Sequence, residues 1–170
     1  MIKIPIMEEE VKKAKEEIKV FDEQKTFDKF SCNNNFLGVL GEMVFTRWLK
    51  ENHLPFIHVK FVKKSWDDED FVIDYKKVDI KTTFDTKMWF QKAIHDIYIL
   101  SRVNDDLKTL FVLTYITKHR LEKLLSEGKI EIIEREGRKD YVVYISQMHP
   151  IEQYIRETYP NNEINFGEAI

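Results

Sequence analysis

The chain has 170 residues, 43% of them hydrophobic, so it can bury one substantial core and we expect a single domain over residues 1–170. No stretch is apolar over the roughly 18 residues that a membrane span needs, and the N-terminus lacks the apolar segment of a signal peptide, so we expect a cytoplasmic protein with no membrane partner. The single cysteine excludes an internal disulfide and any cysteine-based zinc or iron–sulfur site. A net charge of −3 leaves a nucleic-acid partner open, because binding depends on where positive charge clusters.

Two helices are predicted in the first third of the chain. Apolar spacing predicts a charged amphipathic surface helix over residues 8–21. The polar residues 31–35 include three asparagines, which are good N-caps for a second helix over residues 36–51. That helix is apolar around nearly its whole circumference and is expected to be buried. Three strands are then predicted, at residues 58–63, 70–74 and 78–83, with a turn at residues 75–77.

The second half of the chain alternates between helical and apolar stretches. A helix is predicted near residues 88–95, followed by buried strands at 97–100 and 110–116. A helix stopped by glycine, a hairpin and a short closing helix follow, at residues 119–128, 130–145 (turning at 136–138) and 150–158. The fold class is therefore α/β or α+β, with a central mixed sheet flanked by helices.

The most informative stretch holds two aspartates and a lysine. Alternate residues of a strand share a face, so Asp79 and Lys81 point one way while Val78 and Ile80 point into a core. An even number of residues in the preceding connection places Asp70 on the face of Asp79, whereas an odd loop without a bulge does not. The pattern predicts an acidic pair with an ammonium group beside it.

Carboxylates on neighbouring strands can share a hard divalent cation, because strands lie about 4.8 Å apart and Mg²⁺ binds oxygen at about 2.0–2.1 Å. Lys81 can then orient a water molecule and offset negative charge on a phosphoryl transition state. Glu42 is a third acid, almost the only charge in a helix that is expected to be buried, and a cation shared with the two aspartates relieves the cost of burying it. This is the chemistry of phosphodiester hydrolysis.

These residues together resemble the PD-(D/E)xK nuclease superfamily, which includes restriction endonucleases and Holliday junction resolvases. The resemblance covers about residues 35–116, between the first helix and a helix–hairpin–helix extension at 117–170. It implies an αβββαβ core. It also implies a Mg²⁺ site, where Mn²⁺ can substitute, and an endonuclease that acts on DNA as a homodimer. The implied metal ligands are Glu42, Asp70, Asp79 and the Ile80 carbonyl, and Lys81 is the implied catalytic lysine.

The sequence departs from the family pattern at two places. Glu69 stands where a proline often precedes the first aspartate, which leaves Asp68 as a rival for the role of Asp70. Gln91 and Tyr98 match the glutamine–tyrosine motif of exonuclease relatives only loosely, which argues against an exonuclease.

Other readings and residues stay open. Lys81 can form an ordinary salt bridge, and the chain can be a nuclease-fold module that binds nucleic acid without cleaving it, or an interaction protein. RNA is not excluded as a substrate. Trp48 is expected in the core, whereas Trp66 and Trp89 are candidates for base stacking. The four histidines considered lack the spacing of a metal motif: His58, His95, His119 and His149. Candidate nucleic-acid contacts are Lys60, Lys63, Lys64, Thr83 and Lys87.

Overall fold

The computed structural model describes residues 1–22, 29–59, 69–135, 138–164 and 166. The helices are α1 (Glu8–Asp22), α2 (Lys29–Glu51), α3 (Lys118–Ser126) and α4 (Ile151–Thr158). The strands of the first half are β1 (Ile2–Pro5), β2 (Ile57–His58), β3 (Phe71–Ile73), β4 (Lys76–Thr83) and β5 (Lys87–Phe90). Those of the second half are β6 (Ile97–Val103), β7 (Thr109–Thr117), β8 (Glu131–Arg135), β9 (Arg138–Tyr144) and β10 (His149–Pro150). No helix in the described part of the chain combines the length and apolar character needed to cross a bilayer.

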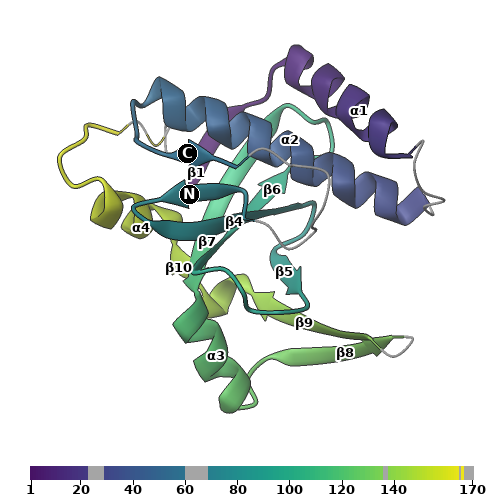
Figure 1. Cartoon of the computed structure of the whole chain (residues 1–170), viewed down its shortest axis with the longest axis vertical. Coiled ribbons are helices and arrows are strands. Elements are labelled where there is room, and N and C mark those ends of the chain that lie inside the picture. Colours follow the sequence, from purple (N-terminus) through teal and green to yellow (C-terminus); the bar gives the residue numbers. More distant parts are fainter. Residues whose placement is uncertain (23–28, 60–68, 136–137, 165, 167–170) are drawn as a thin grey trace.

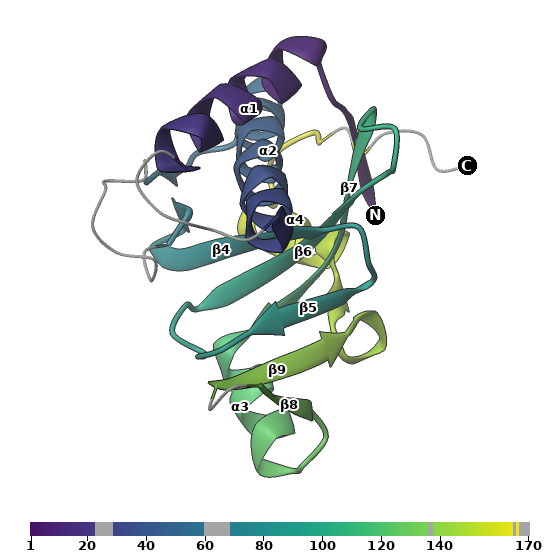
Figure 2. The same cartoon turned by 90° about the vertical axis from the view of Figure 1, so that its right-hand side faces the viewer.

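The strands form two sheets (Figures 1 and 2). The larger has the order β1-β7-β6-β4-β3-β2, with β10 added at β7, and the smaller has the order β5-β9-β8. Pairing is parallel between β4 and β6 and antiparallel between the other paired strands that the structure describes. The predicted central mixed sheet flanked by helices is confirmed.

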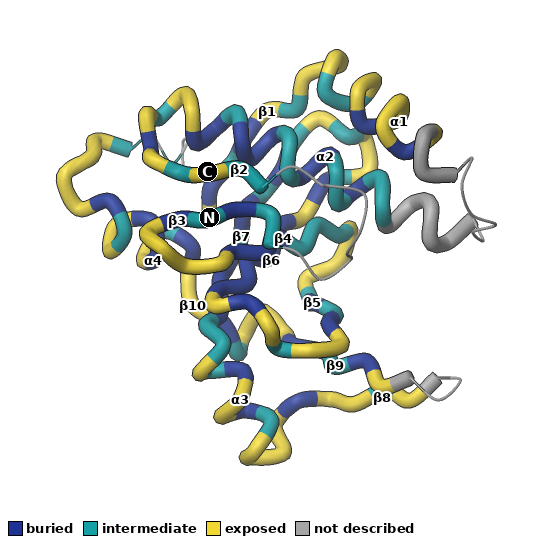
Figure 3. The backbone as a smooth tube through the Cα atoms, in the orientation of Figure 1, coloured by how far each residue is buried: buried dark blue, intermediate teal, exposed yellow. Residues whose placement is uncertain are grey.

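The core lies in two clusters on opposite faces of the larger sheet. Along β6, Ile97 and Ile99 join the cluster that contains α2 and α4, while Tyr98 and Leu100 join the cluster that contains β5, β9 and α3. This alternation follows from the two-residue period of a strand that is covered on both sides. Figure 3 shows the buried residues of β4, β6 and β7, which lie between the elements that form the two clusters.

The predicted helix at residues 88–95 is wrong. Residues 87–90 form strand β5, which pairs with β9 from Lys87↔Tyr144 to Phe90↔Tyr141. Met88 and Phe90 are buried, whereas Lys87 and Trp89 are half-buried. Burial therefore alternates with the two-residue period of a strand. The connection between the parallel strands β4 and β6 therefore runs through the second sheet, where the αβββαβ order has a helix.

Other boundaries differ less. Helix α2 begins at Lys29, so the asparagines at 33–35 lie inside the helix and do not cap it. Asparagine is a weak helix former but does not break a helix. The predicted strand at 58–63 is described only at its beginning, in β2, because residues 60–68 lie outside the described part. The expected glycine stop is confirmed at Gly128, whose φ is 66°.

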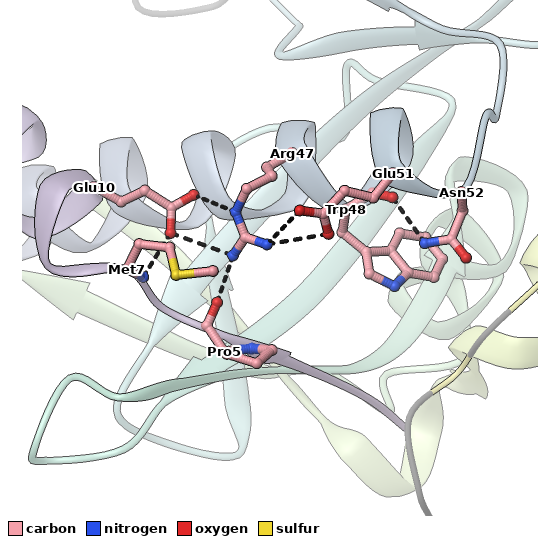
Figure 4. A network of polar contacts seen from close by, with 7 residues as sticks. All are labelled: Pro5, Met7, Glu10, Arg47, Trp48, Glu51 and Asn52. Atoms are coloured by element: carbon pink, nitrogen blue, oxygen red, sulfur yellow. Dashed lines mark hydrogen bonds and ion pairs between the residues drawn. The ribbon is translucent and has the colours of Figure 1, made fainter.

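A single arginine joins α2 to the N-terminal elements (Figure 4). Arg47 donates from Nε to Glu10 of α1 at 2.9 Å, from Nη1 to Glu51 at 3.0 Å, and from Nη2 to the carbonyl of Pro5 at the end of β1. All three groups of the guanidinium are used, which suits its rigid fork of donors. The contact fixes α1 against the layer that carries α2.

Helix α2 packs closely against β4 at Gly41. A Cβ atom added there would lie 1.8 Å from Oγ1 and 2.8 Å from Cβ of Thr82 on β4, whereas one added at Gly38 meets nothing within 4 Å. Thr82 is itself held by a 2.8 Å hydrogen bond between its hydroxyl and that of Ser101. Gly41 therefore sets the distance between the helix and the strand.

We predict opposite effects for two alanine substitutions on this helix. Gly41→Ala forces α2 away from β4 and lowers the free energy of unfolding by about 1–3 kcal/mol. Gly38→Ala, the matched control, raises it by about 0.5–1 kcal/mol, because alanine costs less backbone entropy in a helix. Urea denaturation of both variants measures this, and equal shifts in both would contradict the close approach.

Candidate functional site

The β3–β4 hairpin brings Asp70, the residue just before β3, close to β4 and to Asp79. Asp74 and Tyr75 form a two-residue loop with φ values of 49° and 59°, which is the type I′ geometry of a tight hairpin. Phe71 pairs with Val78, and the Asp70 amide donates to the Val78 carbonyl at 3.1 Å. The loop has the even length that the face argument required, although it lies at 74–75 and not at 75–77.

The carboxylate of Asp70 extends the hairpin ladder. Its Oδ2 accepts a 2.7 Å hydrogen bond from the amide of Ile80. Burial first, and then the negative charges of Glu42 and Asp79, raise the pKa of Asp70 well above its usual value, against the lowering effects of this hydrogen bond and of Lys81. Asp70 is thus the point at which the three carboxylates interact.

Asp79 and Lys81 form a pair on one face of β4. Asp79 is only 4% exposed, and its two carboxylate oxygens both lie 2.9 Å from Lys81 Nζ. Nζ donates to Oδ1, while the buried Oδ2 has no hydrogen bond among the described residues. Burial lowers the pKa of Lys81, but the charge and hydrogen bond of Asp79 outweigh it and the pKa is raised. Lys81 is therefore an ammonium group, 42% exposed.

Glu42 reaches the site from the other side of the sheet. Helix α2 belongs to the cluster that contains Val78 and Ile80, so it packs against the face of β4 opposite to Asp79 and Lys81. The Glu42 side chain is 24% exposed, which makes it half-buried and not fully buried as expected. Its charge nevertheless reaches Asp70.

This arrangement bears on metal binding. Among the residues that the structure describes, no three His, Cys, Asp or Glu side chains stand where one ion could bind them all. The donor chemistry fits a hard divalent cation, since the set consists of carboxylates and includes Asp79 Oδ2, which is buried beside the Lys81 ammonium but accepts no hydrogen bond from the described residues. Side chains must move before Glu42, Asp70 and Asp79 can share an ion.

Two histidines lie beside these acids, and the spacing of histidines in the sequence does not indicate either of them. His58 Nε2 is 3.7 Å from Glu42 Oε2. His95 is 5% exposed and its ring packs edge-on against Tyr98, the partner of Asp79 on β6. Burial lowers the pKa of His95, and the charge of Asp79 opposes this effect. Strand and loop pairing between segments far apart in sequence brings them here, so no local motif marks them.

The other sequence candidates are placed as follows. The Oγ1 of Thr83 accepts from the Asp85 amide at 3.1 Å, and Lys87 pairs with Asp85 at 3.5 Å while lying over the ring of Trp89. Trp48 is 5% exposed, which confirms its core position. Five candidates lie outside the described residues: Lys60, Lys63, Lys64, Trp66 and Asp68.

Comparison with solved structures gives a distant likeness to a viral nuclease. No protein family and no curated protein matches this sequence. Among solved structures, a nuclease from a fusselovirus matches with a TM-score of 0.41 and 12% sequence identity, over 80% of this chain and 98% of that chain. A likeness of this size shows neither a common family nor a common activity.

We predict that removing the charge of Asp70 stabilises the metal-free protein. At pH 7, Asp70→Asn relieves repulsion by Glu42 and Asp79 while keeping an acceptor for the Ile80 amide, and raises the free energy of unfolding. Asp70→Ala also strands the Ile80 amide and is less stable than the Asn variant by about 1–3 kcal/mol.

The gain from Asp70→Asn also depends on pH. Because the folded-state pKa of Asp70 is raised, the native protein becomes protonated there as pH falls, and the difference between wild type and variant shrinks. Urea denaturation in EDTA between pH 4 and pH 8 measures both effects. An Asn variant clearly less stable than wild type at pH 7 would contradict the repulsion.

Proposed function

We propose that this chain is a metal-dependent nuclease that hydrolyses phosphodiester bonds in DNA. The observation that carries the proposal is the position of Asp70, whose pKa is raised by the negative charges of both Glu42 and Asp79. Clustered carboxylates destabilise a fold unless a cation offsets them, so such a cluster favours a cation-binding role. An ammonium group, Lys81, lies beside it at 2.9 Å from Asp79.

The proposed cation is Mg²⁺, held by carboxylates of this cluster. Asp79 Oδ2 is the first ligand we assign, because it is buried and has no hydrogen bond among the described residues. Asp70 lies within electrostatic reach of Asp79, and Glu42 adds a third negative charge. The Ile80 carbonyl stays a predicted ligand. A bound divalent cation would polarise the phosphoryl group and offset its charge.

Lys81 supplies the positive group that this reaction needs. Its side chain is part-exposed, which leaves room for a phosphate oxygen or a water molecule beside it, and its ammonium nitrogen lies 2.9 Å from the Asp79 carboxylate. An ammonium there stabilises charge that develops on the phosphoryl oxygens and orients a water by hydrogen bonding. Its raised pKa favours these two roles over that of a general base.

A second candidate is a protein of similar fold that binds nucleic acid, or another partner, without catalysis. The observation that favours it is that Asp70 and Asp79 already have structural partners, the Ile80 amide and the Lys81 ammonium. Under this alternative the two aspartates complete a hairpin and a salt bridge. Binding of DNA without cleavage, unchanged by EDTA, is the result that this candidate requires.

We predict that Lys81→Ala lowers DNA cleavage at least 100-fold in Mg²⁺, because it removes charge stabilisation of the transition state. The matched control is Lys76→Ala on the same strand, whose side chain is 50% exposed and lies 3.9 Å from Asp74, and its rate stays within threefold of wild type. Nicking of supercoiled plasmid measures both rates, and circular dichroism checks that each variant is folded.

The substrates in that assay also test the finer proposals. Linear duplex, single-stranded and four-way-junction DNA, each with Mg²⁺ or EDTA, separate internal cleavage from digestion at ends. Full activity of Lys81→Ala on all of these substrates would overturn the proposed role of Lys81. A wild-type protein that cleaves none of them would overturn the proposal that the chain is a nuclease. The homodimer stays a prediction that sedimentation equilibrium measures.

A further inference from the structure

His58 has a fixed position at the edge of the larger sheet. It lies in β2 opposite Phe71, and the two rings stack with centroids 5.2 Å apart at 23°. Phe71 is fully buried and is held in turn by edge contacts with Phe45 and Phe56. Because the phenyl ring cannot move without disturbing the core, the plane of the imidazole is fixed as well.

The imidazole nitrogen Nε2 faces a carboxylate without bonding to it. Nε2 lies 3.7 Å from Glu42 Oε2, beyond hydrogen-bond range, and has no hydrogen bond among the described residues although the atom is buried. Buried polar atoms are rarely left unsatisfied, and one that is calls for an explanation such as an absent ion. The His58 and Glu42 side chains are 27% and 24% exposed, so the pair lies close to the protein surface although Nε2 itself is buried.

We propose that His58 Nε2 and Glu42 Oε2 are two ligands of one divalent transition-metal ion. Ligand atoms bound at about 2.1 Å, at angles between square and tetrahedral, lie about 3.0–3.5 Å apart, so the observed pair needs to close by only a few tenths of an ångström. Asp70 lies within electrostatic reach of Glu42 and adds negative charge. Water or a phosphate oxygen fills the other positions.

This assignment changes the expected metal preference. Imidazole nitrogen binds first-row transition ions well, whereas Mg²⁺ prefers oxygen ligands and keeps its water. His58 therefore favours Mn²⁺ and the later first-row transition-metal ions over Mg²⁺ at this position. Any catalytic role of this metal site rests on the proposed nuclease function. Metal binding by His58 and Glu42 requires no cleavage activity.

Pulsed electron paramagnetic resonance of bound Mn²⁺ is the test, because a directly coordinated imidazole nitrogen modulates the echo decay. Wild type is expected to show this ¹⁴N modulation, replaced by a ¹⁵N pattern when the protein carries ¹⁵N-histidine. His58→Gln removes the signal and weakens Mn²⁺ binding at least tenfold by calorimetry, while changing Mg²⁺ binding less than threefold. The matched control His119→Gln, at an exposed position on α3, leaves all three measurements unchanged.

Each outcome decides the proposal. Wild type that binds no Mn²⁺, or binds it without histidine nitrogen, overturns it and leaves an ordinary ion pair between His58 and Glu42. A nitrogen signal that persists in His58→Gln also overturns it, since another histidine is then the ligand. Should His58→Gln fail to fold, Glu42→Gln takes its place, and unaltered Mn²⁺ affinity in that variant overturns the site. If the protein cleaves DNA in Mg²⁺ but its bound Mn²⁺ shows no histidine nitrogen, only this inference is refuted. If bound Mn²⁺ shows histidine nitrogen but the protein cleaves no DNA, only the proposed nuclease activity is refuted.

Discussion

The hydrogen bond from the Ile80 amide to the Asp70 carboxylate is the contact on which the candidate site depends. At 2.7 Å, it takes the place of a backbone partner next to the point where the β3–β4 ladder ends, and it holds a negative charge where Asp79 and Glu42 can both act on it. A neutral acceptor would serve the ladder equally well, so the charge itself has no structural need. This surplus of charge is the physical reason to assign the cluster to cation binding rather than to folding.

Helix α2 brings the third carboxylate to this hairpin, and it does so from the opposite face of the sheet. The close contact between Gly41 and Thr82 sets how near the helix comes, and Arg47 ties the helix to α1 and β1. Glu42 follows Gly41 directly, so the packing contact and the charged group move together. The same face carries His58, which gives Glu42 a nitrogen neighbour that Asp79 does not share.

The parallel pairing of β4 with β6 explains why Asp79 and Lys81 lie where they do. Both strands are covered on two faces, by α2 and α4 on one side and by the smaller sheet with α3 on the other. Asp79 therefore sits beside Tyr98, on the side of the second cluster, and is almost completely buried. Its ammonium partner reaches solvent because Lys81 has a long side chain with its charge at the tip.

Local pattern in the sequence was enough for the amphipathic helix α1, for the hairpin that carries Asp70 and Asp79, and for the shared face of Asp79 and Lys81, because each depends on periodicity or on the length of one loop. Strand β5 was misjudged as a helix, since its pairing partner β9 lies about fifty residues away and short apolar runs are ambiguous by themselves. Which face Glu42 approaches from, and that His58 meets it, were decided by the packing of α2 and the pairing of β2 with β3. Contacts between distant segments leave no periodic trace in the chain, so only the tertiary structure determined them.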